Sequence, residues 1–99
     1  MTKPTPGPWR VVHRQNSYQF LVFTDGQEQD VLIAYMPSDN PRIGLANARL
    51  IAASPELLEA LTELLKTIDL VRDGAMSVKP LGSAMERASA AIRKARGES

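Results

Sequence analysis

The sequence predicts an α+β fold in which an N-terminal three-stranded antiparallel meander packs against two to three C-terminal helices. Before residue 40, the chain holds short runs rich in Val, Ile and aromatic residues; after it, apolar residues recur at helical 3–4 spacing. Only a few turn-forming residues separate these elements. The length of 99 residues suits one hydrophobic core, so we expect residues 1–99 to form a single domain.

Three runs carry the β signal, and they are WRVVHR (9–14), YQFLVFT (18–24) and DVLIAYM (30–36). Asp25-Gly26 predicts a two-residue hairpin between the second and third runs, because glycine accepts the positive φ that such turns need. The link RQNS at 14–17 is short enough for another hairpin. We therefore expect an extended, proline-rich arm at 1–8 and a β meander at 9–36.

The helical part of the chain is expected at 41–96. Asn40 and Pro41 predict its start, because an asparagine side chain can accept a backbone N–H and proline suits the first helical position. Gly44 leaves open whether the helix begins at Pro41 or nearer Leu45.

The stretch NARLIAASPELLEAL at 47–61 places a proline inside strongly helical sequence. Ser54 is a good N-cap residue, Pro55 fits the first position of a helix, and Glu56 lies in the first turn, where the helix dipole favours an anion. We therefore expect Pro55 to start a second helix rather than to interrupt the first.

Apolar residues form a stripe along this second helix, and the same stripe predicts the core. The side chains expected to be buried together are Trp9, Phe20, Ile33, Leu50, Leu57, Leu61, Leu64, Leu65 and Ile68. Residues 75–82 are expected to form a loop. A last helix from about Ser83 to Ala95 carries an alanine-rich face that suits close helix–helix approach.

Composition excludes several classes of protein. Hydrophobic content of 43% and charged content of 23% are typical of a globular domain. A net charge of +1 creates no general attraction to nucleic acid or to a membrane, and no stretch reaches the ~20 apolar residues of a transmembrane helix. The absence of cysteine excludes disulfides and thiol chemistry. We expect a soluble, cytoplasmic protein.

Residues able to support catalysis are few. His13 is the only histidine, with no cysteine or carboxylate close to it in the sequence, so we expect a partly exposed strand residue and no metal ligand. Paired carboxylates can perform acid–base chemistry, but Glu56, Glu59 and Glu63 lie opposite a leucine stripe, as a solvated helix face does. No glycine-rich phosphate loop occurs. We expect no enzymatic activity, no cofactor and no metal.

Two blocks of the sequence carry a family resemblance. TPGPW at 5–9, followed by ANARLIAASPELLEAL at 46–61, resembles a widespread group of small proteins of bacteriophages and prophages. Members of that group share this type of opening and this alanine- and leucine-rich block. The resemblance covers about a fifth of the chain. It implies a phage or prophage origin and no particular chemistry.

Basic residues near the C-terminus define one candidate site, for nucleic acid, and they are Arg87, Arg93, Lys94 and Arg96. Cations in a final helical turn are also expected from the helix dipole alone. The pI of about 8.1 lies below the values above ~9 that are usual for nucleic-acid-binding domains. Nucleic-acid binding through these residues is therefore the alternative function, and protein binding through the sheet, described next, is the preferred one.

The sheet supplies the preferred candidate site. Both faces of the predicted strands are apolar, although one helical layer covers only one face. The second face is expected to carry Val12, Leu21, Phe23, Leu32 and Ala34, with Arg10 and Arg14 at its rim. Alternatively, the N-terminal arm or the last helix of the same chain folds over this face. An apolar centre with a charged rim is typical of a protein–protein interface.

These features predict a non-enzymatic phage or prophage accessory protein that acts by binding a protein. The partner is expected to be a host protein, a bacterial defence protein or a second copy of the chain. An inhibitor of a host process or of a defence system, comparable to an anti-CRISPR protein, is the most concrete version, and it rests on analogy with other small phage proteins. The alternative is a nucleic-acid-associated phage protein.

Overall fold

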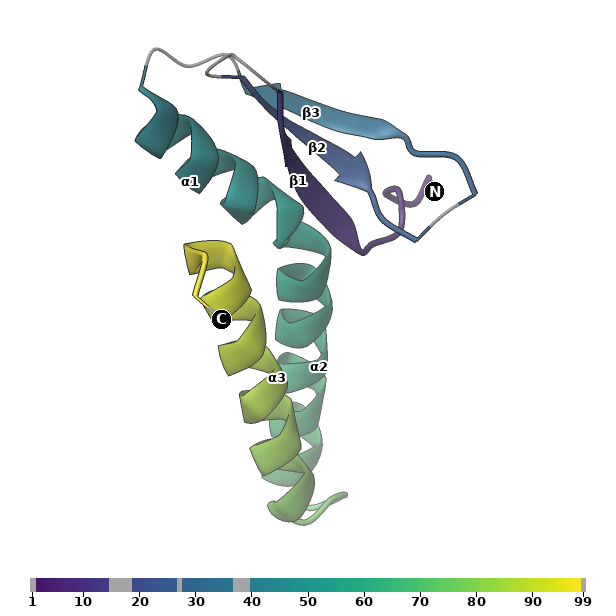
Figure 1. Cartoon of the computed structure of the whole chain (residues 1–99). Helices are drawn as coiled ribbons and strands as arrows, with labels where there is room; N and C mark the ends of the chain where they lie inside the picture. Colours follow the sequence, from purple (N-terminus) through teal and green to yellow (C-terminus); the bar gives the residue numbers. More distant parts are fainter. Residues whose placement is uncertain (1, 15–18, 27, 37–39, 99) are drawn as a thin grey trace.

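The structure, a computed structural model, describes residues 2–14, 19–26, 28–36 and 40–98. Its elements, in chain order, are β1 (Trp9–His13), β2 (Phe20–Thr24), β3 (Leu32–Met36), α1 (Pro41–Ala52), α2 (Ser54–Arg72) and α3 (Lys79–Arg96). The predicted α+β class is confirmed: an antiparallel sheet precedes three helices (Figure 1).

The three strands form a meander in the order β1-β2-β3, with β2 in the centre. Val11 lies opposite Val22, and Val22 lies opposite Ala34, so these three side chains share one face of the sheet. The predicted link between the first two strands, at 14–17, falls almost entirely outside the described residues.

The connection between β2 and β3 is longer than the predicted two-residue hairpin. Gly26 does adopt a positive φ of 75°, as the turn signal requires. However, β2 ends at Thr24 and β3 begins only at Leu32. The Thr24 N–H donates to the carbonyl oxygen of Val31 at 2.9 Å, and the Val31 N–H donates to Oγ1 of Thr24 at 2.9 Å. This pair closes a wider loop.

A β-bulge in the β2–β3 pairing changes which β3 side chains face the helices. Val22 pairs with Ala34 and Phe23 pairs with Leu32, so Ile33 is the extra residue of β3. Regular alternation along the strand would place Ala34 on the same face as Leu32, as was expected from the sequence. That placement is wrong, because the bulge moves Ala34 to the face that carries Val22.

The core lies between the sheet and α1. Small residues of α1, namely Gly44, Ala48 and Ala52, are buried, and they let the helix lie close to the sheet. Phe20 and Val22 of β2 are buried with Ala48 and Ala52, which confirms the prediction for Phe20. The partly buried side chains packed around this cluster are Trp9, Val11, Ile33, Ala34, Met36, Leu45 and Ile51.

The start of α1 agrees with the cap predicted from the sequence. Oδ1 of Asn40 accepts the N–H of Arg42 at 3.0 Å and the N–H of Ile43 at 3.4 Å. Pro41 occupies the first turn, where its missing N–H costs no intrahelical hydrogen bond. The helix therefore begins at Pro41, and Gly44 lies within it.

The boundary between α1 and α2 lies where Ser54-Pro55 predicted it, but its chemistry differs. α1 ends at Ala52 and α2 begins at Ser54. The predicted capping role of Ser54 is wrong, since its hydroxyl donates to the Leu50 carbonyl oxygen at 3.2 Å. Ala53, between the two helices, is fully buried and keeps a helical conformation. The helix axis nevertheless changes direction at this residue, and α2 leaves at an angle to α1 (Figure 1).

The N-terminal arm packs on this bend. A Cβ atom built on Gly7 would lie only 2.6 Å from Cβ of Pro55, so no larger residue fits between the arm and α2 without a shift. The indole Nε1 of Trp9 donates to the Pro6 carbonyl oxygen at 3.1 Å. The blocks at 5–9 and 46–61, which are far apart in the sequence, therefore meet in space.

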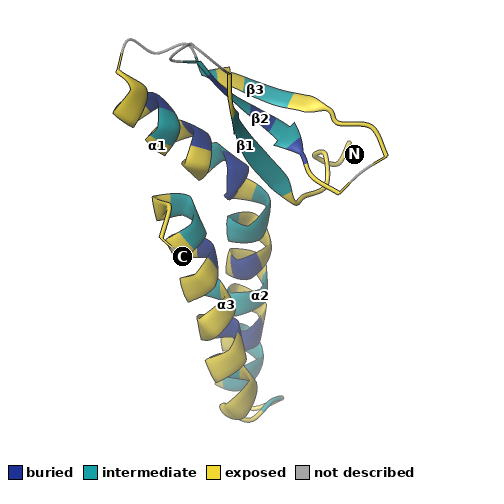
Figure 2. Cartoon of the chain, in the orientation of Figure 1, coloured by how far each residue is buried: buried dark blue, intermediate teal, exposed yellow. Residues whose placement is uncertain are grey.

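Helices α2 and α3 form an antiparallel hairpin that extends away from the sheet, and the molecule measures 55 × 29 × 21 Å (Figure 1). Figure 2 shows buried residues along the line where the two helices face each other. These residues are small: Ala60 and Thr67 on α2, and Ala84 and Ala91 on α3. The alanine-rich face of α3 therefore has the close-packing role expected of it.

α3 begins four residues earlier than predicted. Residues 75–82, which include Pro80 and Gly82, were expected to form a loop. In the structure Lys79–Gly82 belong to the helix. Proline is tolerated in the first turn of a helix, so Pro80 marks a start rather than a connection.

The predicted burial of the leucine stripe is partly wrong. Leu57 and Leu64 are half-buried, but four other members of the predicted core are exposed: Leu50, Leu61, Leu65 and Ile68. For Leu61, Leu65 and Ile68 the reason is that α2 turns its small residues toward α3, whereas Leu50 lies on α1. The leucines lie on an adjacent side of the helix, which no described residue of the chain covers.

Mutation can test whether Asn40 and Ser54 act as helix caps, because only the Asn40 side chain accepts backbone N–H groups. We expect Asn40→Ala to lower the free energy of unfolding by about 1 kcal/mol, because two backbone N–H groups lose their acceptor. Ser54→Ala should change it by less than about 0.5 kcal/mol, because only an exposed hydroxyl-to-carbonyl bond is lost. Urea denaturation of both variants measures the difference. Equal losses would show that Ser54 acts as a cap.

Candidate functional site

The face of the sheet opposite α1 carries the candidate interface. Register places Arg10 beside Phe23 and Val12 beside Leu21 on this open face, and β3 contributes Leu32 and Tyr35 next to Phe23 and Leu21. Leu32 is 51% exposed and Tyr35 is 43% exposed, whereas the side chains of the two other strands are half-buried. The open face is thus apolar at its centre.

Most of the predicted interface residues lie together on this face. Val12, Leu21, Phe23 and Leu32 form its apolar part and Arg10 lies at its edge, whereas Ala34 faces α1 instead. Arg14 follows the last residue of β1 and its Nη1 donates to Oε1 of Gln19 at 3.2 Å.

The structure also adds Tyr35, which lies opposite Leu21 and which regular alternation from Leu32 would place on the other face of the sheet. Its position follows from the β-bulge between Val22 and Phe23, and a single sequence gives no direct signal for a bulge.

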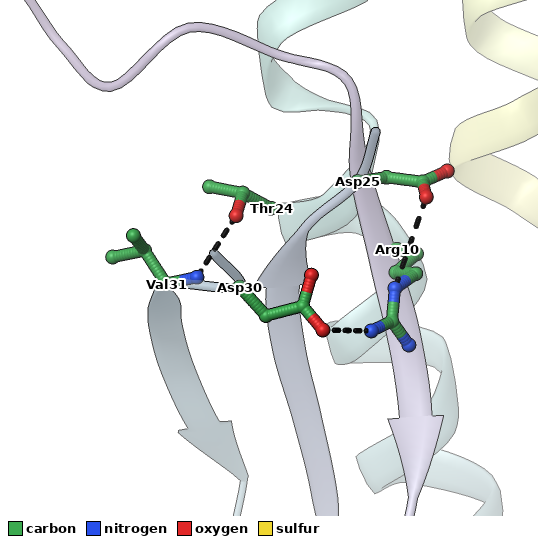
Figure 3. Close-up of polar contacts among 5 residues, drawn as sticks. All are labelled: Arg10, Thr24, Asp25, Asp30 and Val31. Atoms are coloured by element: carbon green, nitrogen blue, oxygen red, sulfur yellow. Dashed lines mark hydrogen bonds and ion pairs between the residues drawn. The ribbon is translucent and has the colours of Figure 1, made fainter. Parts of the chain in front are cut away.

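Arg10 anchors the charged edge of the open face (Figure 3). Its Nη2 lies 2.8 Å from Oδ2 of Asp30, and its Nε lies 3.8 Å from Oδ1 of Asp25. The guanidinium carbon lies 5.8 Å from the centre of the Phe23 ring, which is a cation–π distance. These side chains are about half exposed, so the ion pairs contribute little stability, at most about 1 kcal/mol each. Their main effect is to hold charges of both signs beside Phe23.

Thr24 positions the loop that supplies both aspartates. The residue is fully buried, and its hydroxyl accepts the Val31 N–H at the end of the loop (Figure 3). The Asp25 N–H donates to the Pro8 carbonyl oxygen at 2.9 Å, which ties the start of the loop to the N-terminal arm. Two fixed ends therefore set the positions of Asp25 and Asp30.

Neither predicted cover seals the open face. The arm packs beside Pro55, and α3 packs on α1 and α2. Among the described residues, the helices cover only the face that carries Phe20 and Val22 (Figure 1).

Two of the four basic residues of the alternative site, Arg87 and Lys94, lie in a groove between α2 and α3, whereas Arg93 and Arg96 are exposed outside it. Arg87 pairs with Glu63, and Nζ of Lys94 lies 2.5 Å from Oε1 of Glu56. Acidic and basic side chains of both helices line this groove of about 330 Å³. Glu56 and Glu63 are therefore half-buried partners of α3 rather than members of a solvated face, which corrects the sequence-based interpretation.

His13, the remaining candidate for catalysis or metal binding, packs against a neighbouring ring of the sheet. His13 ends β1, is exposed, and stacks on Phe20 with ring centres 4.6 Å apart. Within the described part of the chain, no group of three or more His, Cys, Asp or Glu residues is placed to hold a metal ion. No described helix is long and apolar enough to cross a membrane.

Comparison with known families gives one match. A family model described as Salmonella phage P22 protein Y8K6 matches residues 1–99, the whole chain. Neither the curated proteins nor the solved structures gave a match. The family match supports the phage origin that the two sequence blocks predicted.

The closure of the β2–β3 loop can be tested at Thr24. Thr24→Val keeps the shape of the buried side chain but removes the acceptor of the Val31 N–H, so we expect that amide to exchange with solvent roughly five- to tenfold faster. Thr24→Ser keeps the hydroxyl and is the matched control, which should preserve the slow exchange. Hydrogen exchange followed by NMR measures both. Unchanged exchange in Thr24→Val would contradict the proposed closure.

Proposed function

This chain belongs to the Salmonella phage P22 protein Y8K6 family, and we propose that it is a non-enzymatic phage accessory protein that acts by binding another protein. The open face of the sheet, with Phe23 and Leu32 at its centre, is the proposed binding surface. We propose that the protein acts in the cytoplasm of the bacterial host.

One observation carries this proposal: the helices cover one face of the sheet, while the other face is apolar. A large aromatic ring at the centre of such a face buries much area at a small entropic cost. Phe23 holds this position, and Arg10 lies over its ring. Aromatic and arginine side chains are also the residue types most often found to dominate interface energies.

The edge of the surface favours a protein partner over a membrane or a nucleic acid. Arg10, Asp25 and Asp30 place opposite charges next to the apolar centre. A mixed rim supports specific pairing with complementary charges, whereas phosphate groups would require a surplus of positive charge.

The partner that we propose is a host protein or a component of a bacterial defence system, which the phage protein inhibits by occupying its surface. The phage family supports this choice, since a phage accessory protein acts inside a host cell. The absence of a recognisable catalytic constellation in the sequence is the reason for preferring binding to chemistry.

The nucleic-acid alternative has weaker support. Two of its four basic residues, Arg87 and Lys94, form ion pairs with carboxylates of α2. Paired cations release fewer counterions when they meet phosphates, so they contribute less affinity. A steep decrease of DNA affinity with increasing salt would favour this alternative.

The proposed function can be tested by comparing matched variants in partner capture. The tagged protein is incubated with host lysate, and the captured protein is identified, purified and titrated against each variant. We expect Leu32→Asp to weaken the complex by about thirtyfold or more, which corresponds to about 2 kcal/mol, because it places a charge in the apolar centre. Phe23→Asp should abolish binding.

Two controls make the result specific. Ser77→Asp adds the same charge at an exposed position between α2 and α3 and should leave the affinity unchanged. Leu32 is half exposed, so Leu32→Asp should keep the helical circular-dichroism signal even where Phe23→Asp unfolds the protein. Equal affinities for the wild type, Leu32→Asp and Ser77→Asp would contradict the proposed surface.

A further inference from the structure

The outer edge of β3 is a strand edge without the usual protection. The order β1-β2-β3 leaves one side of β3 without a paired strand among the described residues. No charged residue occurs between Val31 and Met36, and Val31, Leu32 and Tyr35 are exposed. Sheet edges usually carry charged side chains or proline, because unpaired backbone groups attract another strand.

The opposite edge of the sheet is different. Arg49 of α1 and Lys94 of α3 line a groove together with Trp9 and Val11 of β1, so two cations lie beside that strand. Charged side chains beside an edge disfavour the addition of a further strand. β3 lies on the side of the sheet away from α2 and α3 (Figure 1). It is therefore the edge at which a further strand can be added.

Hydrogen bonds inside the sheet show which way the backbone groups of each strand point. The Thr24 N–H donates to the Val31 carbonyl oxygen, so Thr24 directs its backbone groups toward β3. These directions alternate along an antiparallel strand, so Phe23 and Leu21 direct their groups toward β1. A β3 residue that lies opposite Phe23 or Leu21 therefore makes no backbone hydrogen bond to β2.

Two residues of β3 meet this condition. Leu32 lies opposite Phe23, and Tyr35 lies opposite Leu21. The N–H and C=O groups of Leu32 and Tyr35 consequently point to the outer edge of β3, and they are three residues apart. In a regular strand such groups recur at every second residue.

The β-bulge at Ile33 causes this spacing and limits which strand can pair there. Ile33 and Ala34 both pack on the side of α1, whereas Leu32 and Tyr35 both lie on the open face. The order of faces from 32 to 35 is therefore the same in both directions. A regular strand cannot pair with Leu32 and Tyr35 together, but a second, antiparallel β3 has the same spacing and the same order of faces.

We propose that a second copy of the chain pairs its β3 with this edge, antiparallel and about a two-fold axis, so that the two sheets form one sheet of six strands. Leu32 of each copy then lies opposite Tyr35 of the other, and the two bulges lie opposite each other. A two-fold interface requires a self-complementary patch, and the spacing within β3 provides one. An aromatic and an aliphatic side chain opposite each other on one face also stabilise the pairing.

The pairing is small and the dimer is consequently weak. Four residues of each strand span about 13 Å, and interfaces of such limited size belong to the weak class. We expect a dissociation constant on the order of 100 μM.

This inference goes beyond the proposed function and concerns the edge of the sheet instead of its open face. The pairing leaves the open faces of both copies uncovered and joins them into one wider surface. Its tests need no other protein, so a failure of the dimer leaves the proposed function standing, and a failure of the proposed function leaves the dimer standing.

Sedimentation equilibrium of the full chain tests the pairing. At about 1 mM we expect the wild type to approach twice the chain mass of 10.8 kDa. Tyr35→Pro removes an N–H that points to the edge, and proline is tolerated at such a position of an edge strand, so this variant should keep its fold and have the mass of one chain. Tyr35→Ala removes the same side chain but keeps the N–H. It is the matched control and should still associate.

Cysteine cross-linking tests the register and does not depend on the folding of the proline variant. The natural chain has no cysteine. In an oxidised mixture of Leu32→Cys and Tyr35→Cys chains, we expect disulfides between unlike variants, because opposite residues of a hydrogen-bonded pair have Cα atoms about 5.5 Å apart. Two copies of Leu32 would be about 10 Å apart along the strands, which exceeds the ~7 Å limit of a disulfide. Ser77→Cys, exposed between α2 and α3, should give no cross-link.

Three outcomes would overturn the proposal. A wild-type chain that is monomeric at about 1 mM excludes the dimer. Association of a folded Tyr35→Pro that is as strong as that of Tyr35→Ala shows that the backbone of β3 does not form the contact. Disulfides that join identical chains only, without links between Leu32→Cys and Tyr35→Cys, contradict the proposed register.

Discussion

The contact between α2 and α3 decides which surfaces this protein presents. Its inner residues are small, with Ala60 facing Ala88 and Ala91, so the helices approach closely and leave no room for leucines between them. The leucines of α2 are consequently turned to the outside. Fully burying one leucine stabilises a fold by about 1.5–3 kcal/mol, and the isolated chain gains only part of this from its exposed leucines. This side of the hairpin therefore stays apolar and exposed in the single chain.

The bend at Ala53 and Pro55 connects the hairpin to the rest of the fold. Proline cannot donate its i→i−4 hydrogen bond, and its ring conflicts with the preceding turn, so α2 leaves at an angle to α1. The N-terminal arm then packs against the outside of the bend, where Gly7 gives Pro55 the space it needs. The two sequence blocks that resemble phage proteins therefore form one contact. This contact fixes the direction of the hairpin relative to the sheet.

Local signals in the sequence were sufficient for the element order, for the cap at Asn40 and for the break at Pro55, because each depends on a few neighbouring residues. Burial was harder to predict, because it depends on which helix face meets another element. The leucine stripe and the alanine face are both regular, and the sequence does not say which one pairs inside the chain. The position of Ala34 depended on a bulge, and the pairing of Glu63 with Arg87 depended on the packing of α2 on α3. Tertiary contacts determined both, so periodicity alone did not reveal them.

The most direct test of this account is the set of methyl contacts made by α2 in solution, measured as nuclear Overhauser effects in methyl-labelled protein. With a mixture of labelled and unlabelled chains, contacts within a chain are distinguished from contacts between chains. The account predicts that Ala60 contacts Ala88 and Ala91, and that Leu65 makes no methyl contact with Ala84 or Ala91, the buried residues of α3. Methyl contacts of Leu65 with Ala84 and Ala91 of the same chain would contradict it, since the leucines would then form the seam between α2 and α3.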